Sequence, residues 1–217
     1  MSEVKAQRSG GRTPTDPVPD IVVGRLPVYL RALNHLLDEG QQVTASKQLA
    51  RRLGISSAQI RKDLSHFGEF GKQGMGYDIA RLRDELRSIL QVDRQWDMAL
   101  VGAGDLGHAI VHYGGFEGRG FHVSCVFDNN PQKIGRHLRD LEILDIARLQ
   151  QEVGERGIRI AIVAVPAGAA QGVVDTLVAA GIKAILNYAP ITVTVPRDIR
   201  IQYIDPVVHL QHMTYYL

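Results

Sequence analysis

The stretch WDMALVGAGDLGHA, from Trp96 to Ala109, decides the fold of the second half of the 217-residue chain. A short apolar run leads directly into Gly102, Gly104 and Gly107, which are spaced as GxGxxG. In a strand–turn–helix unit the first glycine makes the turn, the second admits a pyrophosphate, and the third lets the helix pack on the strand. The pattern predicts a dinucleotide site with the phosphates at the helix N-terminus.

The next apolar run, FHVSCVF, ends at Asp128, which follows Gly107 by 21 residues. A carboxylate there can accept hydrogen bonds from both ribose hydroxyls of an adenosine, and it repels a 2′-phosphate, so the sequence favours NAD(H) over NADP(H). The alternative interpretation is a structural glycine turn that binds nothing. The predicted cofactor residues of this region are Gly102, Ala103, Gly104, Asp105, Leu106, Gly107 and Asp128.

The rest of the C-terminal half alternates between strand and helix patterns. IRIAIVAV and KAILNYAP are apolar enough for buried parallel strands, and AGAAQGVVDTLVAAG between them is typical of a crossover helix. Ligands bind outside the carboxyl ends of such strands. Val165, Pro166, Asn187 and Tyr188 are therefore candidates to flank a nicotinamide, although each is equally explained as an ordinary turn residue. The single cysteine, Cys125, lies in an apolar run and is expected to pack in the core, and no metal site is predicted.

The N-terminal half predicts short helices. Apolar residues recur at spacings of three and four over residues 26–39, 44–53 and 56–67, each followed by a glycine, and a further helix is expected over residues 79–90. The candidate N-caps are Thr44 or Ser46 for the second helix and Ser56 or Ser57 for the third. The stretch GEFGKQGMGYDI is typical of a two-stranded hairpin, the wing of a winged-helix module.

The third helix combines small, amide and cationic side chains on its outer face, as a helix that enters a DNA major groove requires. Residues 1–94 also hold 15 Lys and Arg against 11 Asp and Glu, whereas residues 95–217 hold 10 against 12. A small helical adaptor with a solvated charged face is the alternative. The candidate DNA-binding residues on these helices are Lys47, Ser57, Gln59, Arg61, Lys62, Ser65 and His66.

The sequence divides into four parts. Residues 1–20, rich in proline and polar groups, are expected to be a disordered tail, followed by a winged-helix domain over 21–94, a dinucleotide-binding α/β domain over 95–204, and a final helix over 205–217. The longest apolar runs are far shorter than a membrane span, and the N-terminus has no secretion-signal pattern, so we expect a cytoplasmic protein.

The final segment, DPVVHLQHMTYYL, predicts a capped helix with an unpartnered face. Asp205 can cap it, Pro206 fits the first turn, and Leu210, Met213 and Leu217 form an apolar face that needs a partner.

A dehydrogenase needs a proton-transferring group beside the nicotinamide, commonly a histidine or lysine oriented by a carboxylate. The candidates His209 and His212 lie in a final helix that is too short to form a substrate domain. The sequence therefore favours a dinucleotide that is sensed and not used in catalysis. Two alternatives stay open: an NAD- or CoA-binding subunit of an enzyme completed by a partner chain, and a dimeric scaffold that binds NAD structurally.

Several blocks in fixed order carry a family resemblance: RLPVYLRAL, SSAQIRKDLSHFGEFGKQGMGYDI, LVGAGDLGHAI, FDNNPQKIG, VPAGAAQ and AGIKAILNYAP. From about Arg25 to the C-terminus, the chain resembles the Rex family of redox-sensing transcriptional repressors. The resemblance implies a non-enzymatic homodimer with an N-terminal winged helix and a Rossmann domain. Such proteins bind palindromic operator DNA when NADH is scarce and release it when NADH binds.

The same resemblance implies roles for single residues in DNA binding. Arg61 and Lys62 fall on the recognition helix, and Lys72 and Gln73 fall on the wing that follows the minor groove. Family members often have arginine at the position of Gln73.

The resemblance also implies an allosteric network. Asp205 would pair with Arg31 in the DNA-binding state and with Tyr113 when NADH is bound, and the C-terminal helix would cross to the other subunit in a domain swap. The residue after this aspartate is commonly aromatic, where this chain has Pro206.

Overall fold

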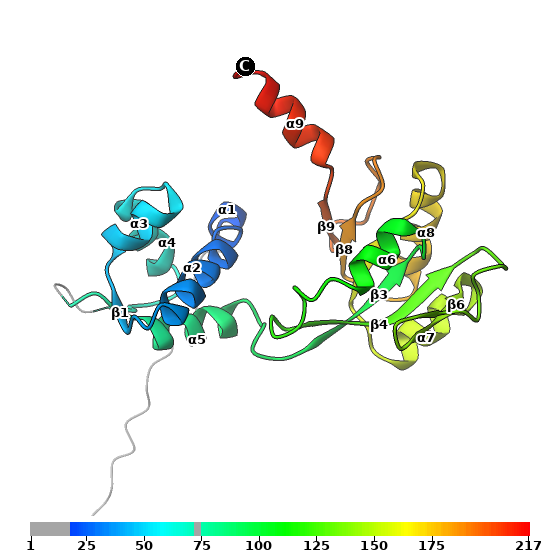
Figure 1. The fold of residues 1–217 in the computed structure, drawn as a ribbon, viewed down its shortest axis with the longest axis horizontal. Helices are drawn as coiled ribbons and strands as arrows, with labels where there is room; N and C mark the ends of the chain where they lie inside the picture. The colour runs from blue at the N-terminus through cyan, green and yellow to red at the C-terminus, as the bar shows by residue number, and fades with distance from the viewer. Residues whose placement is uncertain (1–17, 72–74) are drawn as a thin grey trace, which may run out of the picture. The chain divides into compact units, whose positions relative to one another are not determined.

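The computed structural model of the chain describes residues 18–71 and 75–217 (Figure 1). The chain divides into two compact units, with the boundary in the sequence between Asp93 and Arg94. The predicted wing residues Lys72 and Gln73, and residues 1–17 of the expected tail, lie outside the described residues. Asp20, the last residue of that expected tail, already begins a helix.

The first unit consists mainly of helices. Its elements are α1 (Asp20–Val23), α2 (Leu26–Asp38), β1 (Val43–Thr44), α3 (Ser46–Leu53), α4 (Ser57–Ser65), β2 (Tyr77–Asp78) and α5 (Ile79–Ile89). The periodic apolar residues form one core, in which Leu33 of α2, Ile60 of α4 and Leu86 of α5 are fully buried. Burial of side chains of this size contributes roughly 1.5–3 kcal/mol each. The predicted amphipathic faces therefore pack as expected.

Of the two side-chain caps predicted in the first unit, one is confirmed. Ser56 caps α4, since its Oγ accepts the Gln59 N–H at 3.1 Å. The predicted caps of α3 are wrong: α3 begins after Ala45 without a side-chain cap. Thr44 instead lies buried in the strand β1, and its Oγ1 donates to the Gln48 side chain at 3.1 Å. The local sequence pattern assigned Thr44 to the helix, but in the structure it pairs in a strand.

The end of the wing pairs with the strand that precedes α3. The strand β2 pairs antiparallel with β1, and the middle of the predicted hairpin, residues 72–74, lies outside the described residues. The close pairing requires Gly76, whose φ is 78° and where a Cβ would lie 2.5 Å from the Thr44 carbonyl oxygen. The base of the wing is thereby held against the residues that precede α3.

The second unit is a doubly wound α/β domain. Its first elements are β3 (Trp96–Val101), α6 (Asp105–Val111), β4 (Phe121–Asp128), β5 (His137–Leu138), β6 (Leu141–Asp145), the 3-10 helix η1 (Ile146–Arg148) and α7 (Leu149–Glu155). They are followed by β7 (Ile160–Val163), α8 (Ala167–Ala179), β8 (Ala184–Asn187), β9 (Arg200–Tyr203) and α9 (Pro206–Thr214). The seven-stranded sheet has the order β5-β6-β4-β3-β7-β8-β9, and all its pairs are parallel except β5 with β6.

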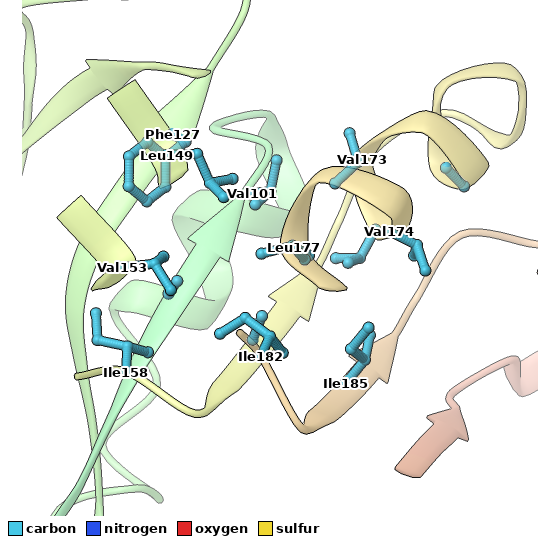
Figure 2. Close-up of a cluster of buried hydrophobic side chains, with 14 of the residues drawn as sticks. Val101, Phe127, Leu149, Val153, Ile158, Val173, Val174, Leu177, Ile182 and Ile185 are labelled. Carbon is cyan, nitrogen blue, oxygen red and sulfur yellow. The ribbon is translucent and has the colours of Figure 1, made fainter. Parts of the chain in front are cut away.

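Helices cover both faces of this sheet. Val101 and Phe127 face α7 and α8, where Val153 and Leu177 complete one core (Figure 2). Leu100 faces the opposite side and packs in a second core with Ile110 and Val111 of α6. Alternate residues of β3 thus enter different cores, which explains why the strand is apolar from Met98 to Val101.

The sheet order also locates the ligand edge. After β3 the chain moves to β4 on one side, and after α7 it returns to β7 on the other side of β3. The carboxyl ends of β3 and β7 therefore form a topological switch point, where open α/β sheets bind ligands. The predicted α/β fold class is confirmed.

The helix α9 has the predicted cap and an exposed apolar face. Asp205 Oδ1 accepts the Val207 N–H at 2.9 Å, and Pro206 is the first helical residue. Leu210 and Met213 are 58 % and 61 % exposed, and α9 has no buried residue. The domain-swapped position of this helix stays a prediction. Among the described residues, no helix is long and apolar enough to cross a membrane.

Candidate functional site

The first glycine of the turn after β3 is required by the fold. Gly102 has a φ of 106°, and its N–H donates to the Phe127 carbonyl oxygen at 2.8 Å. A Cβ at this position would lie 2.2 Å from the Ala164 carbonyl oxygen. The close approach of the loops after β3 and β7 therefore leaves no room for a side chain.

The other two glycines of the motif differ from each other. A Cβ on Gly107 would lie 2.0 Å from the Gly102 carbonyl oxygen, so this glycine lets α6 pack on the turn. A Cβ on Gly104, the residue before α6, would meet no atom within 4 Å. Because the fold does not need a glycine there, the open space suits a ligand that approaches the backbone, as the pyrophosphate of a dinucleotide does.

Asp128 ends β4 as a buried carboxylate at the same edge. Its Oδ1 accepts the Asn130 N–H at 2.8 Å, and its Oδ2 accepts the Ala103 N–H at 2.8 Å and the Lys133 Nζ at 3.3 Å. Burial would raise the pKa of Asp128, but the two backbone hydrogen bonds and Lys133 hold it below its ordinary value. The side chain is therefore an ionised acceptor beside the glycine turn.

A cleft of about 350 Å³ lies between these groups. Small-molecule sites are roughly 300–1,000 Å³ in volume, so the cleft suits part of a dinucleotide. Of the predicted cofactor residues, it is lined by Gly102, Gly104, Asp128, Val165 and Pro166. It is also lined by Asn129, Asn130, Lys133 and Ile146, which were not predicted as site residues. Asn129, Asn130 and Lys133 belong to the stretch directly after Asp128, so their position in the sequence could have indicated them.

The remaining predicted cofactor residues lie around this cleft without lining it. Ala103 is buried and contributes its N–H to Asp128, while Asp105, Leu106 and Gly107 form the first turn of α6. Asn187 is fully buried, and its Nδ2 donates to the carbonyl oxygens of Ala189 and Ile191, both at 3.2 Å. Asn187 thus organises the loop after β8, and contacts of Asn187 or Tyr188 with a nicotinamide stay predictions.

The candidate DNA-binding residues that the structure describes lie on α3 and α4 or directly after α4. Arg61, Lys62, Ser65 and His66 are exposed on or just after α4, Lys47 is exposed on α3, and Ser57 and Gln59 are half-buried in the first turn of α4. A concavity of about 1060 Å³ between α3, α4 and the start of the wing brings together Lys47, Arg61 and Ser65. Arg61 Nη1 donates to Ser46 Oγ at 3.1 Å, so one cation of the recognition helix is directed toward α3.

A buried ion pair behind this surface was not predicted. Asp63 on α4 has an exposed fraction of 0 %, and it accepts from Arg25 at 2.6 and 2.8 Å and from the Tyr29 hydroxyl at 2.5 Å. Asp63 lies between Ile60 and Leu64 on the apolar face of α4. An acidic residue on an apolar helix face is the feature of the sequence that could have indicated this buried ion pair. The pair fixes α4 to the start of α2.

The structure describes the surroundings of each of the three predicted switch residues within its own unit. Arg31 is exposed on α2, and Tyr113 is 56 % exposed with its ring edge-on to Phe116 at 5.2 Å. The Asp205 carboxylate is bonded to the Val207 N–H. Their exchange of partners therefore stays a prediction.

Two further features limit the chemistry of the site. Cys125 is buried and its pKa is raised to about 11, chiefly by burial, which suits a packing role. Within residues 18–71 and 75–217, no cluster of His, Cys, Asp and Glu could hold a metal ion.

Two family models match the two units of the chain. Residues 17–65 match "Putative DNA-binding protein N-terminus", and residues 93–191 match "CoA binding domain". The chain is also 50 % identical over 203 residues to the redox-sensing transcriptional repressor Rex of Chloroflexus aurantiacus, covering 94 % of this chain and 96 % of the relative. It is 43 % identical to the Rex protein of Brevibacillus brevis, covering 93 % of this chain and 98 % of the relative.

Solved structures of similar proteins agree with these matches. A crystal structure of RSP in complex with β-NAD⁺ and operator DNA is 37 % identical, with a TM-score of 0.88, covering 93 % of each chain. A structure of RSP with β-NADH is 35 % identical, with a TM-score of 0.84, covering 93 % of this chain and 95 % of that chain. The relatives are repressors and not enzymes. From the identity along nearly its whole length and the two units found in order, the chain belongs to the Rex family of redox-sensing transcriptional repressors.

Proposed function

We propose that this chain is a repressor that binds operator DNA as a homodimer and leaves it when NADH binds. The observation that carries the proposal is a single chain with two different surfaces, an exposed basic α4 in a winged helix and a glycine-lined cleft ending at Asp128. RSP, a relative with both units, has been crystallised with operator DNA and NAD⁺ and with NADH. The chain would thereby report the ratio of NADH to NAD⁺.

The cleft suits NAD(H) more than NADP(H). The Asp128 carboxylate can accept the ribose hydroxyls, whereas a 2′-phosphate would meet its negative charge. The N-terminal turn of α6 and the open space at Gly104 would receive the pyrophosphate. When bound, the nicotinamide supplies the redox state that is sensed.

The composition of the cleft supports sensing over catalysis. Among the described residues that line it, the ionisable side chains are Asp128 and Lys133, and these two pair with each other at 3.3 Å. A dehydrogenase needs an acid or base placed to exchange a proton with its substrate. The described part of the cleft offers none that is separate from this pair.

Dimerisation would join the two functions. The exposed apolar face of α9 needs a partner, and a second copy of the chain is the partner that the family resemblance implies. Closure of the dinucleotide domains on NADH would then move the two α4 helices away from the spacing of one DNA turn, or a multiple, that two half-sites require. In this proposal Asp205 exchanges Arg31 for Tyr113. A repressor works where the DNA is accessible, which supports a cytoplasmic location.

A gel-shift titration tests the proposal. The full chain is mixed with the palindromic DNA that it selects from a random pool, and NADH, NAD⁺, NADPH or CoA is added. We expect release by NADH at far lower concentration than by the other three. Release by CoA alone would favour the nucleotide named by the matching family model, and equal responses to NADH and NAD⁺ would favour a structural cofactor.

A further inference from the structure

The buried carboxylate of Asp63 also holds a residue of the recognition surface. Besides Arg25 and Tyr29, it accepts the side-chain Nε2 of Gln59, one turn earlier on α4, at 2.6 Å. Two donors from Arg25, one from Tyr29 and one from Gln59 therefore converge on its two oxygens. Two carboxylate oxygens have about four acceptor sites, so little capacity is left for other partners.

The charge of Asp63 determines which way the Gln59 amide faces. Burial would raise the pKa of Asp63, but hydrogen bonds from Arg25, Tyr29 and Gln59 hold it below its ordinary value. An ionised carboxylate only accepts hydrogen bonds. A flipped amide would place oxygen against oxygen at 2.6 Å, so the NH₂ group must face Asp63 and Oε1 must face away.

Gln59 occupies the part of α4 that reads bases in helix-turn-helix proteins. It is the third residue of the helix, its backbone N–H is used by the Ser56 cap, and its side chain is half-buried. Recognition helices place such N-terminal residues against base edges in the major groove. The orientation of the Gln59 amide thus places Oε1 as a hydrogen-bond acceptor at the N-terminal end of α4.

We propose that Gln59 selects a base with an exocyclic amino group, adenine or cytosine, at one position of each half-site, and that Asp63 is its positioning residue. Adenine N6 and cytosine N4 donate in the major groove, whereas guanine and thymine present O6 and O4 acceptors that an oxygen repels. Adenine ranks first because its N7 can accept the second N–H of the amide. This inference rests on the proposed DNA binding.

The first test is Gln59→Leu in the full chain, which removes the amide and leaves Arg25 and Tyr29 on Asp63. Competition binding is measured without NADH on the selected operator and on its symmetric single-base-pair variants. The parent should prefer adenine, then cytosine, at one position by about five- to 150-fold over guanine or thymine in each half-site. Gln59→Leu should lose this preference at that position only. Lys47→Ala is the matched control, and it should weaken binding to every variant by a similar factor.

The second test separates Asp63 from Gln59. In Asp63→Asn the new amide can donate or accept, so Gln59 can flip, and discrimination against guanine and thymine should shrink while adenine is still bound. If this variant does not fold, NMR of the parent replaces it. The Gln59 side-chain amide, identified as the signal absent in Gln59→Leu, should show one hydrogen shifted and protected by a charge-assisted bond.

The outcomes separate this inference from the proposed function. A parent chain that selects no DNA overturns both. A parent that binds its operator, with a Gln59→Leu variant that keeps the same base preferences, overturns the role of Gln59 alone. If Gln59→Leu loses discrimination at a position where the parent prefers guanine or thymine, Gln59 does not present Oε1 to the base, and that part of the proposal is wrong. A folded Asp63→Asn variant with unchanged preferences, or an unprotected Gln59 amide, overturns the positioning role of Asp63.

Discussion

The three glycines of the GxGxxG motif after β3 are needed for different reasons. The GxGxxG spacing predicts all three, but it does not say that Gly102 and Gly107 serve contacts within the protein while Gly104 faces open space. That distinction needs the position of the Ala164 carbonyl oxygen, which belongs to a loop far along the chain. Replacing Gly102 or Gly107 should destabilise the fold, because a side chain there would clash with protein atoms, whereas replacing Gly104 should weaken ligand binding.

We expect Gly104→Val to abolish binding of NADH and NADPH without unfolding the protein. A branched side chain there would occupy the path of the pyrophosphate, but it would contact no protein atom within 4 Å at its Cβ. Calorimetry measures the binding and a thermal melt the fold. Gly154→Val is the matched control, because its position in α7 is also open and lies outside the cleft. Retained NADH affinity in Gly104→Val would show that the phosphates lie elsewhere.

Asp128→Ala should narrow the preference for NADH over NADPH. The variant loses hydrogen bonds from the ribose hydroxyls to a charged acceptor, each worth about 1.5–3 kcal/mol, and it also loses the repulsion of a 2′-phosphate. Loss of one such bond corresponds to a roughly 10- to 150-fold fall in NADH affinity and loss of both to a larger fall, whereas NADPH affinity should fall less or rise. Isothermal titration with both cofactors checks this. Equal affinities of the unaltered protein for both would contradict the role of Asp128.

At the scale of elements, the sequence predicts best where a local pattern is sufficient. The apolar periodicity located α2, α4 and α5, and the apolar runs located β3 and β4. It missed β5, which has only two residues and is too short to show a pattern, and it missed β6 and β9, which are defined by pairing with the distant strands β4 and β8. Thr44 was assigned to a helix cap for the same reason, since its strand partner Tyr77 lies beyond α4.

The exposed cations of α4, Arg61 and Lys62, are expected to contact the operator. Replacing Arg61 and Lys62 by alanine should weaken operator binding by about 1–3 kcal/mol for each side chain that hydrogen-bonds to a base, while NADH binding persists. For the parent, the logarithm of DNA affinity should fall linearly with the logarithm of salt concentration, and the double variant should show a shallower slope. Arg83→Ala with Arg87→Ala, on α5, is a charge-matched control. A double variant of α4 that binds operator as well as the parent would show that another element reads the DNA.

At the scale of the whole molecule, the sequence predicts both units and their order, and the structure shows that the apolar residues of α9 are exposed. The proposed coupling between NADH and DNA would act through the second copy of the chain that covers this face. Its energy is typically about 1–3 kcal/mol in allosteric proteins.

We expect Asp205→Ala to change NADH-driven release from operator by roughly five- to 150-fold without loss of NADH binding. The measurement is the NADH concentration that releases half of the DNA, compared with the affinity for NADH from calorimetry. The capping bond to Val207 provides the competing explanation. If Asp205 only caps α9, then Asp205→Ser, which can also cap, should restore the parent response, and Asp205→Ala should lower only the melting temperature.

The buried pairing of Asp63 with Arg25 and Tyr29 has a consequence for protein engineering. Transplanting α4 of this chain into a homologue in order to retarget that repressor would carry Asp63 into a chain that needs a cation and a hydroxyl at matching places on another helix. A buried carboxylate without those donors is strongly destabilising. The smallest exchangeable cassette is therefore not one helix but two, the segment from Arg25 through Tyr29 together with residues 56–66.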